Sequence, residues 1–129
     1  MIHKMTEEDF DLMEHWLHKR GREIPDRSLL PDIGYMAHVE GKPVICAFLS
    51  LNNSKLATIG NIASDPENKN RRDAIEPLIE FLGQEAQKLG YRYVALSTNL
   101  IKFKKRLINM GFDKIDEDLE IFGRGLKCQ

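Results

Sequence analysis

The chain has 129 residues, a length typical of one domain and sufficient to bury a hydrophobic core without disulfides or a structural metal. Hydrophobic residues make up 42% and charged residues 30% of the sequence, as in an ordinary globular protein, and the formal net charge is -1. A net charge this small argues against a nucleic acid or a membrane surface as partner, so any charge-based function must be local.

The two cysteines indicate neither a disulfide scaffold nor a metal site. Cys46 lies inside an apolar run and Cys128 lies near the end of the sequence, and their spacing is not that of metal ligands. We expect Cys46 to be a small buried residue that its apolar neighbours keep inert. The opening MIHKMTEEDF lacks the apolar segment of a signal peptide, and no apolar run is long enough to span a bilayer. The sequence therefore predicts a cytoplasmic protein.

The first part of the chain predicts a strand, a helix and a loop. The segment IHKM has the pattern of a short edge strand. Thr6 is predicted to cap a helix, because Asp9 stands at the capping-box position and apolar residues follow at helical spacing as far as Gly21. From Arg22 to Gly34 two prolines and several polar residues predict a loop with at most one helical turn.

Three consecutive strands are predicted next, over residues 35–39, 44–51 and 55–63. The segment EGKP joins the first two as a hairpin turn, and NNS separates the second from the third. Short connections of this kind predict an antiparallel meander.

A helix and a buried strand follow the meander. Apolar residues from Ile75 to Leu89 recur at helical spacing, and Gly90 stands where a helix C-cap is expected. The run YRYVALST, residues 91–98, has little polarity at its centre, which is typical of a parallel strand covered on both faces.

The last part of the chain predicts a second helix and a hairpin. The helix is LIKFKKRLINM, ending at Gly111, and FDKIDEDLEIFGRGL, residues 112–126, alternates as a closing hairpin does. The element order predicts a single domain over residues 1–129, of mixed α/β (α+β) class, with a largely antiparallel sheet.

The segment SDPENKNRRDAIEPLIEF, residues 64–81, raises the question of function. A polar loop with two adjacent arginines leads directly into a helix with a buried face. In one interpretation Asp73 caps the helix and the arginines are solvated. In the other, the loop and the helix start face an anion.

Two segments give the chain a resemblance to the GCN5-related N-acetyltransferase (GNAT) family. In NIASDPENKNRRDAIEPLIEFLGQEAQKLG a strand leads through a Pro-containing loop and an Arg-x-x-small turn to a long helix. In YRYVALSTNLIKFKKRLINMGF a strand, an Asn, a short helix and a Gly-Phe pair follow one another, and Asn99, Gly111 and Phe112 match those points. The two segments cover roughly the C-terminal half, and the N-terminal half agrees in element order.

The resemblance implies an acyl-CoA N-acyltransferase fold with flanking helices, in which the strand before Ser64 and the strand at 91–98 are parallel and splay apart. It also implies acetyl transfer from acetyl-CoA, as co-substrate, to an amine of a small molecule or a protein. The amides of residues 72–76 would bind the pyrophosphate at the start of the helix.

The positions that the resemblance assigns to cofactor binding are Ile62, Ala63, Ser64, Arg71, Arg72, Asp73, Ala74, Ile75, Glu76, Asn99 and Phe103. Two residues depart from the family pattern. Glu76 stands where the family has Gly or Ala, and Pro77 has no N–H, which is best accommodated if the regular helix begins at about Glu76.

The same resemblance requires a base for the amine proton. The candidates are Glu67 and, through a water, Asn61, with Asp65 as a further carboxylate. The acid is often a Tyr on the helix after the Asn, and that position is filled by Leu107. Two functions stay open: an acyltransferase, and a catalytically degenerate GNAT-fold protein that acts as a binding or assembly module.

Other features admit structural interpretations. The basic run Lys102 to Arg106 is either a positive rim for a phosphate-rich ligand or a solvated helix face. His15 and His18 lack the further ligands that a metal site needs, so no metal is expected. The acceptor amine cannot be identified from the sequence, and the oligomeric state, a homodimer included, stays open.

Overall fold

The structure, a computed structural model, describes residues 1–96 and 101–113, and of residues 101 and 102 the backbone alone. The chain divides into two compact units, residues 1–97 and 98–129. The single domain expected from the sequence stays a prediction.

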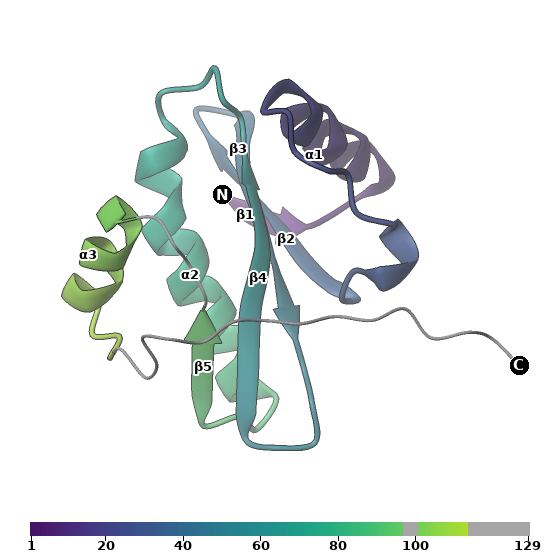
Figure 1. Cartoon of the computed structure of the whole chain (residues 1–129). Helices are drawn as coiled ribbons and strands as arrows, with labels where there is room; N and C mark the ends of the chain where they lie inside the picture. Colours follow the sequence, from purple (N-terminus) through teal and green to yellow (C-terminus); the bar gives the residue numbers. More distant parts are fainter. Residues whose placement is uncertain (97–100, 114–129) are drawn as a thin grey trace, which may run out of the picture. The chain divides into compact units, whose positions relative to one another are not determined.

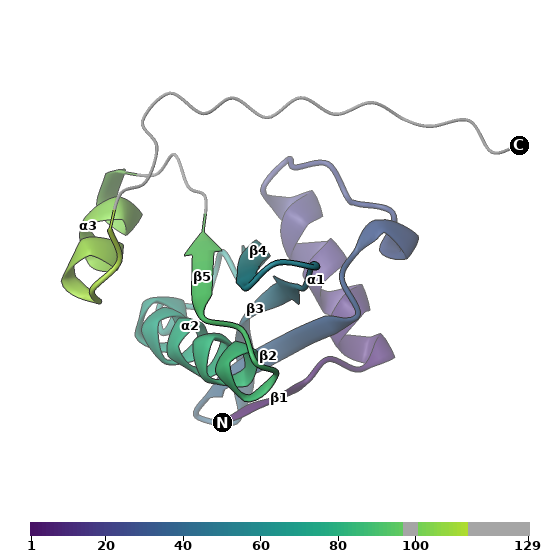
Figure 2. The same ribbon diagram turned by 90° about the horizontal axis from the view of Figure 1, so that it is seen from below.

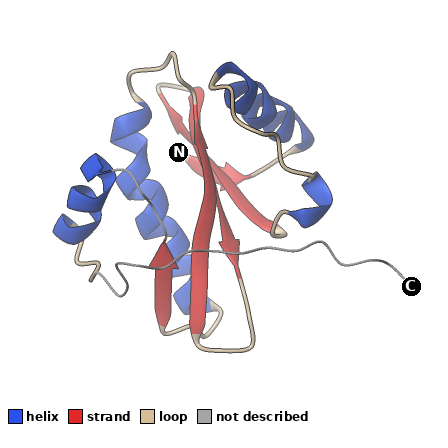
Figure 3. Ribbon diagram, in the orientation of Figure 1, coloured by secondary structure: helices blue, strands red, loops and turns tan. Residues whose placement is uncertain are grey.

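The first unit contains a five-stranded sheet, two α-helices and a short 3-10 helix (Figures 1 and 3). Its elements are β1 (Ile2–Lys4), α1 (Glu7–Lys19), the 3-10 helix η1 (Arg27–Leu29), β2 (Ile33–Val39), β3 (Lys42–Ser50), β4 (Leu56–Ser64), α2 (Arg71–Lys88) and β5 (Tyr93–Leu96). The predicted strand, helix and meander are confirmed, with bounds that differ by a few residues.

The strands lie in the sheet in the order β1-β2-β3-β4-β5, which is also their order in the chain. All neighbours are antiparallel except β4 and β5, which are parallel, with Leu56 opposite Tyr93 and Ile59 opposite Leu96. The predicted class, a largely antiparallel mixed sheet with one parallel pair, is confirmed.

Helices α1 and α2 cover opposite faces of this sheet (Figures 1 and 2). The central strand β3 is therefore buried on both faces from Val44 to Leu49. On the α1 side the core consists of Met13, Trp16, Leu17, Met36, Cys46, Phe48 and Ala63. On its inner face α2 buries Ala74, Leu78, Ile79, Leu82 and Ala86. Cys46 is buried, as predicted, and burial raises the pKa of its thiol to about 12, which disfavours the reactive thiolate.

Helix α1 begins with the predicted capping box. The Thr6 hydroxyl accepts a hydrogen bond from the Asp9 amide at 3.3 Å, and Asp9 Oδ2 accepts one from the Thr6 amide at 2.9 Å. The same Asp9 oxygen lies 3.0 Å from His3 Nε2 on β1. One buried carboxylate thus caps the helix and joins it to the edge strand.

The loop between α1 and β2 contains the predicted single helical turn, and Arg27 fixes this turn to α1. Its guanidinium contacts the carboxylates of Glu7 at 3.3 Å, Asp11 at 2.6 Å and Glu14 at 2.8 Å, and it lies over the Phe10 ring. The hydrogen bond from Arg27 lowers the pKa of Glu14. These contacts hold the loop against the outer face of the helix.

His38 on β2 is expected to make the stability of the first unit depend on pH. Its ring packs 4.6 Å from that of His3, centroid to centroid, and Nδ1 is buried without a hydrogen-bond partner in the described residues. Burial, and next the charges of His3 and of the amino group of Met1, lower the pKa of His38, whereas the charge of Asp9 raises it.

Because the folded pKa of His38 lies below its unfolded value of about 6.5, the unfolded state binds its proton first as the pH falls. Above about pH 6.5 His38 is neutral in both the folded and the unfolded state, and the full stability is present. As the pH falls from there toward the folded pKa, the unfolded state takes up the proton and the free energy of unfolding should decrease. In urea unfolding above and below about pH 6.5, the free energy of unfolding should differ less between the two pH values for His38→Gln than for wild type. His15→Gln, at an exposed position on α1, is the matched control. Equal changes in wild type and His38→Gln would contradict the prediction.

The second unit contains helix α3 (Ile101–Asn109), which confirms the predicted helix. Just beyond the helix, Gly111 has a φ of 92°, a left-handed conformation that favours glycine, and the Phe112 amide donates to the Leu107 carbonyl at 3.0 Å. The predicted closing hairpin at 112–126 lies almost entirely outside the described residues. No helix in the described residues has both the length and the apolarity to cross a membrane.

Candidate functional site

Within the described residues, strand β4 continues beyond its pairing with β5. Its pairing with β5 covers Leu56 to Ile59, whereas its pairing with β3 continues as far as Ser64, opposite Ile45. Along Gly60–Ser64 the edge of β4 on the β5 side therefore has no strand partner in the described residues. A free edge of this kind can pair with an extended, amide-rich ligand.

A β-bulge changes the direction of the backbone in this part of β4. The register with β3 shifts between Cys46 and Phe48, and Asn61 on β4 has a φ of 52°. Asparagine tolerates this left-handed conformation better than most residues, and a bulge bends the strand that contains it. Asn61 is exposed, Ile62 is half-buried, and Ala63 packs in the α1-side core. Ala63 thus contributes its backbone, not its side chain, to the free edge.

The loop from β4 to α2 is held by its own side chains. Asp65 Oδ1 accepts a hydrogen bond from the Glu67 amide and Asn68 Oδ1 one from the Asn70 amide, both at 2.9 Å. The Asp65 amide donates to the Val44 carbonyl at 2.9 Å, which ties the loop to β3. Local bonds of this type order a turn before any ligand binds.

Helix α2 begins at Arg71, which corrects the expectation that the regular helix starts at about Glu76. The N-cap is Asn70, without a side-chain capping bond, so the interpretation of Asp73 as the cap is also wrong. Asp73 instead lies in the first turn, where the helix dipole favours a carboxylate. Pro77 lies inside the helix, and it deprives the Asp73 carbonyl of its usual partner.

The earlier helix start changes which amides can bind an anion. Only the first four N–H groups of an α-helix lack a partner within it, so Ala74, Ile75 and Glu76 donate inside the helix. Asp73 donates to the Asn70 carbonyl at 3.0 Å. Among the predicted donors, residues 72–76, this leaves the Arg72 amide, which has no backbone hydrogen bond in the described residues.

Cationic side chains surround the loop. Arg71 Nη1 donates to the Asn68 carbonyl at 2.8 Å, Lys19 Nζ lies 3.1 Å from Glu67 Oε1, and Arg20 donates to both oxygens of Ser64. Lys19 and Arg20 come from the end of α1. Neither residue is predicted by the sequence pattern, because their place beside β4 follows from packing between segments far apart in the chain.

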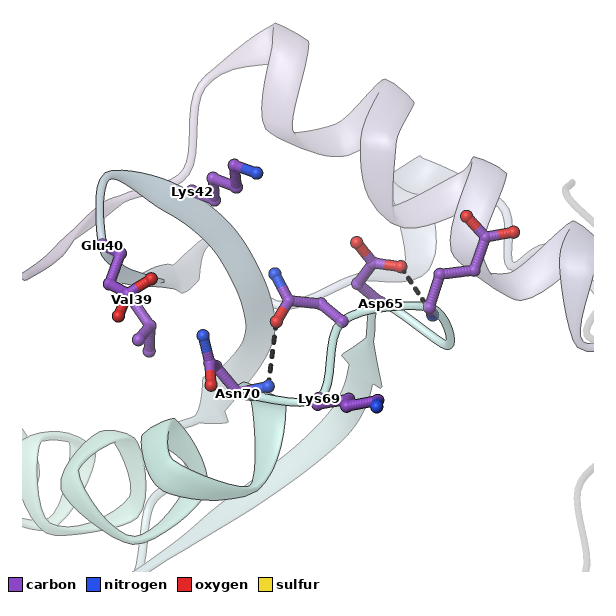
Figure 4. A pocket seen from close by; sticks show the side chains of 8 residues that line it. Val39, Glu40, Lys42, Asp65, Lys69 and Asn70 are labelled. Carbon is purple, nitrogen blue, oxygen red and sulfur yellow. Dashed lines mark hydrogen bonds between the residues drawn. The ribbon is translucent and has the colours of Figure 1, made fainter.

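A polar pocket of about 370 Å³ opens beneath the loop (Figure 4). The β2–β3 turn contributes Val39, Glu40 and Lys42, and the loop contributes Asp65, Glu67, Asn68, Lys69 and Asn70. The lining residues include three carboxylates and two ammonium groups, so the pocket lacks the net positive charge of a phosphate site. In the part of the chain that the structure describes, no three side chains are placed to hold a metal ion.

The remaining predicted residues lie in different places. Glu67 stands in the loop directly after β4, where it pairs with Lys19 and keeps its side chain 73% exposed. Phe103 is half-buried on α3, in the second unit, and Leu107 is buried. Asn99 lies outside the described residues. The binding and proton-transfer roles assigned to these residues stay predictions.

Comparison with solved structures gives high similarity over nearly the whole chain. The aminoglycoside N-acetyltransferase AAC(6')-Iy, bound to a bisubstrate analogue of CoA, superposes with a TM-score of 0.71 at 15% identity, covering 96% of this chain and 97% of that one. The chain has the GNAT acyltransferase fold. The ribosomal-protein alanine N-acetyltransferase of Escherichia coli gives a TM-score of 0.67 at 20% identity, covering 90% of this chain and 79% of that one.

A Mycobacterium tuberculosis protein in complex with CoA likewise has the GNAT fold, with a TM-score of 0.68 at 20% identity over 90% of this chain and 73% of that one. No family model and no curated protein matches the sequence. Identities this low establish a common fold, and the activity has to be inferred from the residues of the chain itself.

Proposed function

We propose that the protein transfers an acetyl group from acetyl-CoA to an amine of a small molecule or a protein. The observation that carries the proposal is the edge of β4 along Gly60–Ser64, which has no strand partner in the described residues and leads through a short loop to a cationic helix start at Arg71. Structural neighbours with the same fold bind CoA or a CoA analogue, which supports this choice of co-substrate.

Each part of the site suits one part of acetyl-CoA. The free edge of β4 offers backbone groups to the two amides of the pantetheine arm, which would extend the sheet as a short strand. The Arg71 and Arg72 side chains and the Arg72 amide would hold the pyrophosphate, with the positive end of the α2 dipole behind them. The bulge at Asn61 would place the thioester near the middle of the sheet.

The transfer itself needs no metal or prosthetic group. The acceptor nitrogen attacks the thioester carbonyl carbon, a C–N bond forms, the C–S bond breaks, and the electron pair of that bond leaves with the CoA sulfur. The amine proton passes to a base, for which Glu67, or a water held by Asn61, is proposed. Because a thiolate is a tolerable leaving group, Leu107 in place of a Tyr does not abolish this reaction.

A second function, a binding module without catalysis, is supported by two observations. Glu67 is engaged by Lys19 at 3.1 Å, which competes with a role as base, and α3 offers no Tyr between Ile101 and Asn109. The two functions predict the same ligand and differ in turnover.

Calorimetric titration with acetyl-CoA, followed by assay of thiol release with an aminoglycoside and an alanine peptide, separates the two functions. For a transferase we expect binding and release, with Glu67→Gln slowing release by about 10²-fold at unchanged affinity. Glu40→Gln, an exposed carboxylate on the opposite wall of the pocket, should leave release unchanged. Binding without release would favour the module, and absence of binding would overturn both functions.

A further inference from the structure

The end of helix α1 is bonded to the end of β4. Arg20 Nη2 donates to Ser64 Oγ at 3.0 Å and Arg20 Nε donates to the Ser64 carbonyl at 3.3 Å, across 44 positions of sequence. Beside it, Lys19 pairs with Glu67. Helix α1 thus brings a guanidinium to the residue where the free edge of β4 ends and the loop to α2 begins.

Arg20 and Arg71 differ from Arg27 in the charge of their partners. Arg27 is surrounded by three carboxylates, which neutralise it. In the described residues the hydrogen-bond partners of Arg20 are the two neutral oxygens of Ser64, and that of Arg71 is the Asn68 carbonyl. A guanidinium has five N–H donors, so both arginines keep donors and full charge for a further acceptor.

The charges around Arg20 are also mutually repulsive. Partial desolvation, and next the positive charges of Arg71 and Arg22, lower the pKa of Arg20, whereas Asp65 opposes this shift. Because repulsion between like charges is relieved when an anion binds among them, this arrangement favours an anionic ligand at the junction of β4, α1 and α2.

We propose that Arg20 is a further phosphate-binding residue of the acetyl-CoA site, supplied by α1 and acting together with Arg71 on the pyrophosphate. The inference rests on the proposed function, since it assigns a residue to that same site. Through Arg20, helix α1 would contribute to the site from the face of the sheet opposite to α2. The bonds to Ser64 hold the guanidinium in place before the ligand arrives, which lowers the entropy cost of binding.

The test measures the Kd for CoA at low and high salt in wild type, Arg20→Met, Arg20→Lys and Arg92→Met. Arg20→Met keeps most of the side-chain stem and removes the charge, so it should weaken binding about 10-fold or more and reduce the salt dependence of Kd. Arg20→Lys keeps the charge and should recover most of the salt dependence. Arg92→Met, a control at an exposed arginine beside Lys55 at the other end of α2, should change Kd about twofold at most, as expected of a distant, screened charge.

Thermal unfolding of each variant checks that it is folded. If Arg20 only anchored Ser64, Arg20→Lys would bind as weakly as Arg20→Met, and the salt dependence would equal that of wild type. Either that result or an unchanged Kd in Arg20→Met would overturn the inference and leave the proposed function standing. Failure of wild type to bind CoA would overturn both.

Discussion

Replacing Phe48 with alanine is expected to lower the free energy of unfolding by about 3–5 kcal/mol, the usual cost of removing a fully buried aromatic ring. Phe48 has no exposed surface and lies at the centre of the α1-side core. Its ring packs against the backbone of Gly34, so closely that a Cβ on Gly34 would lie 2.5 Å from a ring carbon. Backbone held this tightly by strand pairing cannot move in to fill the cavity that alanine leaves.

Urea unfolding followed by circular dichroism gives this free energy. Leu89→Ala removes an apolar side chain that is 54% exposed and serves as the matched control, with an expected change of about 0.5 kcal/mol or less. A loss in Phe48→Ala no larger than in this control would mean that the α1-side core is not packed as described.

Replacing Arg71 with alanine is expected to weaken acetyl-CoA binding by about 1–3 kcal/mol, the range for charge-assisted hydrogen bonds. The Arg71 side chain is partly buried and is held at the first turn of α2 by the Asn68 carbonyl, 2.8 Å from Nη1. It therefore loses little rotamer freedom on contact with a phosphate, and the full charge acts in a fixed place. Added salt should weaken wild-type binding as well.

The comparison variant is Arg92→Ala, which removes an exposed arginine at the other end of α2, beside Lys55. Both variants change the net charge equally, so a loss confined to Arg71→Ala locates the anion at the helix start. Equal affinity of wild type and Arg71→Ala, with no effect of salt, would show that the arginines of this loop are solvated and do not bind the ligand.

Local patterns in the sequence predicted most of the fold. Alternation and turn residues located the strands of the meander to within a few residues, and Thr6 with Asp9 identified the capping box. These features depend on neighbours in sequence, so a single chain contains the information. The parallel pairing of β4 with β5 followed from the resemblance and is confirmed.

The predicted start of α2 is too late because Pro77 was interpreted as lying in the first turn of the helix. The helix instead continues through Pro77, because Leu78, Ile79 and Leu82 bury their side chains against the sheet and offset the lost hydrogen bond. Arg20 was missed for a different reason. Its partner Ser64 is 44 residues away, and no local pattern encodes a contact over that separation.

The order of the strands has a consequence for how the chain reaches this structure. Each strand of the sheet lies beside the strand that precedes it in the chain. The two central pairings close over short turns, and each outer pairing closes over one helix, so no step has to bring together the two ends of an unfolded chain. The entropy cost of closing each loop is therefore low. The sheet can grow outward from the β2–β3–β4 meander, because Gly60–Ser64 of β4 pairs with β3 and does not depend on its pairing with β5.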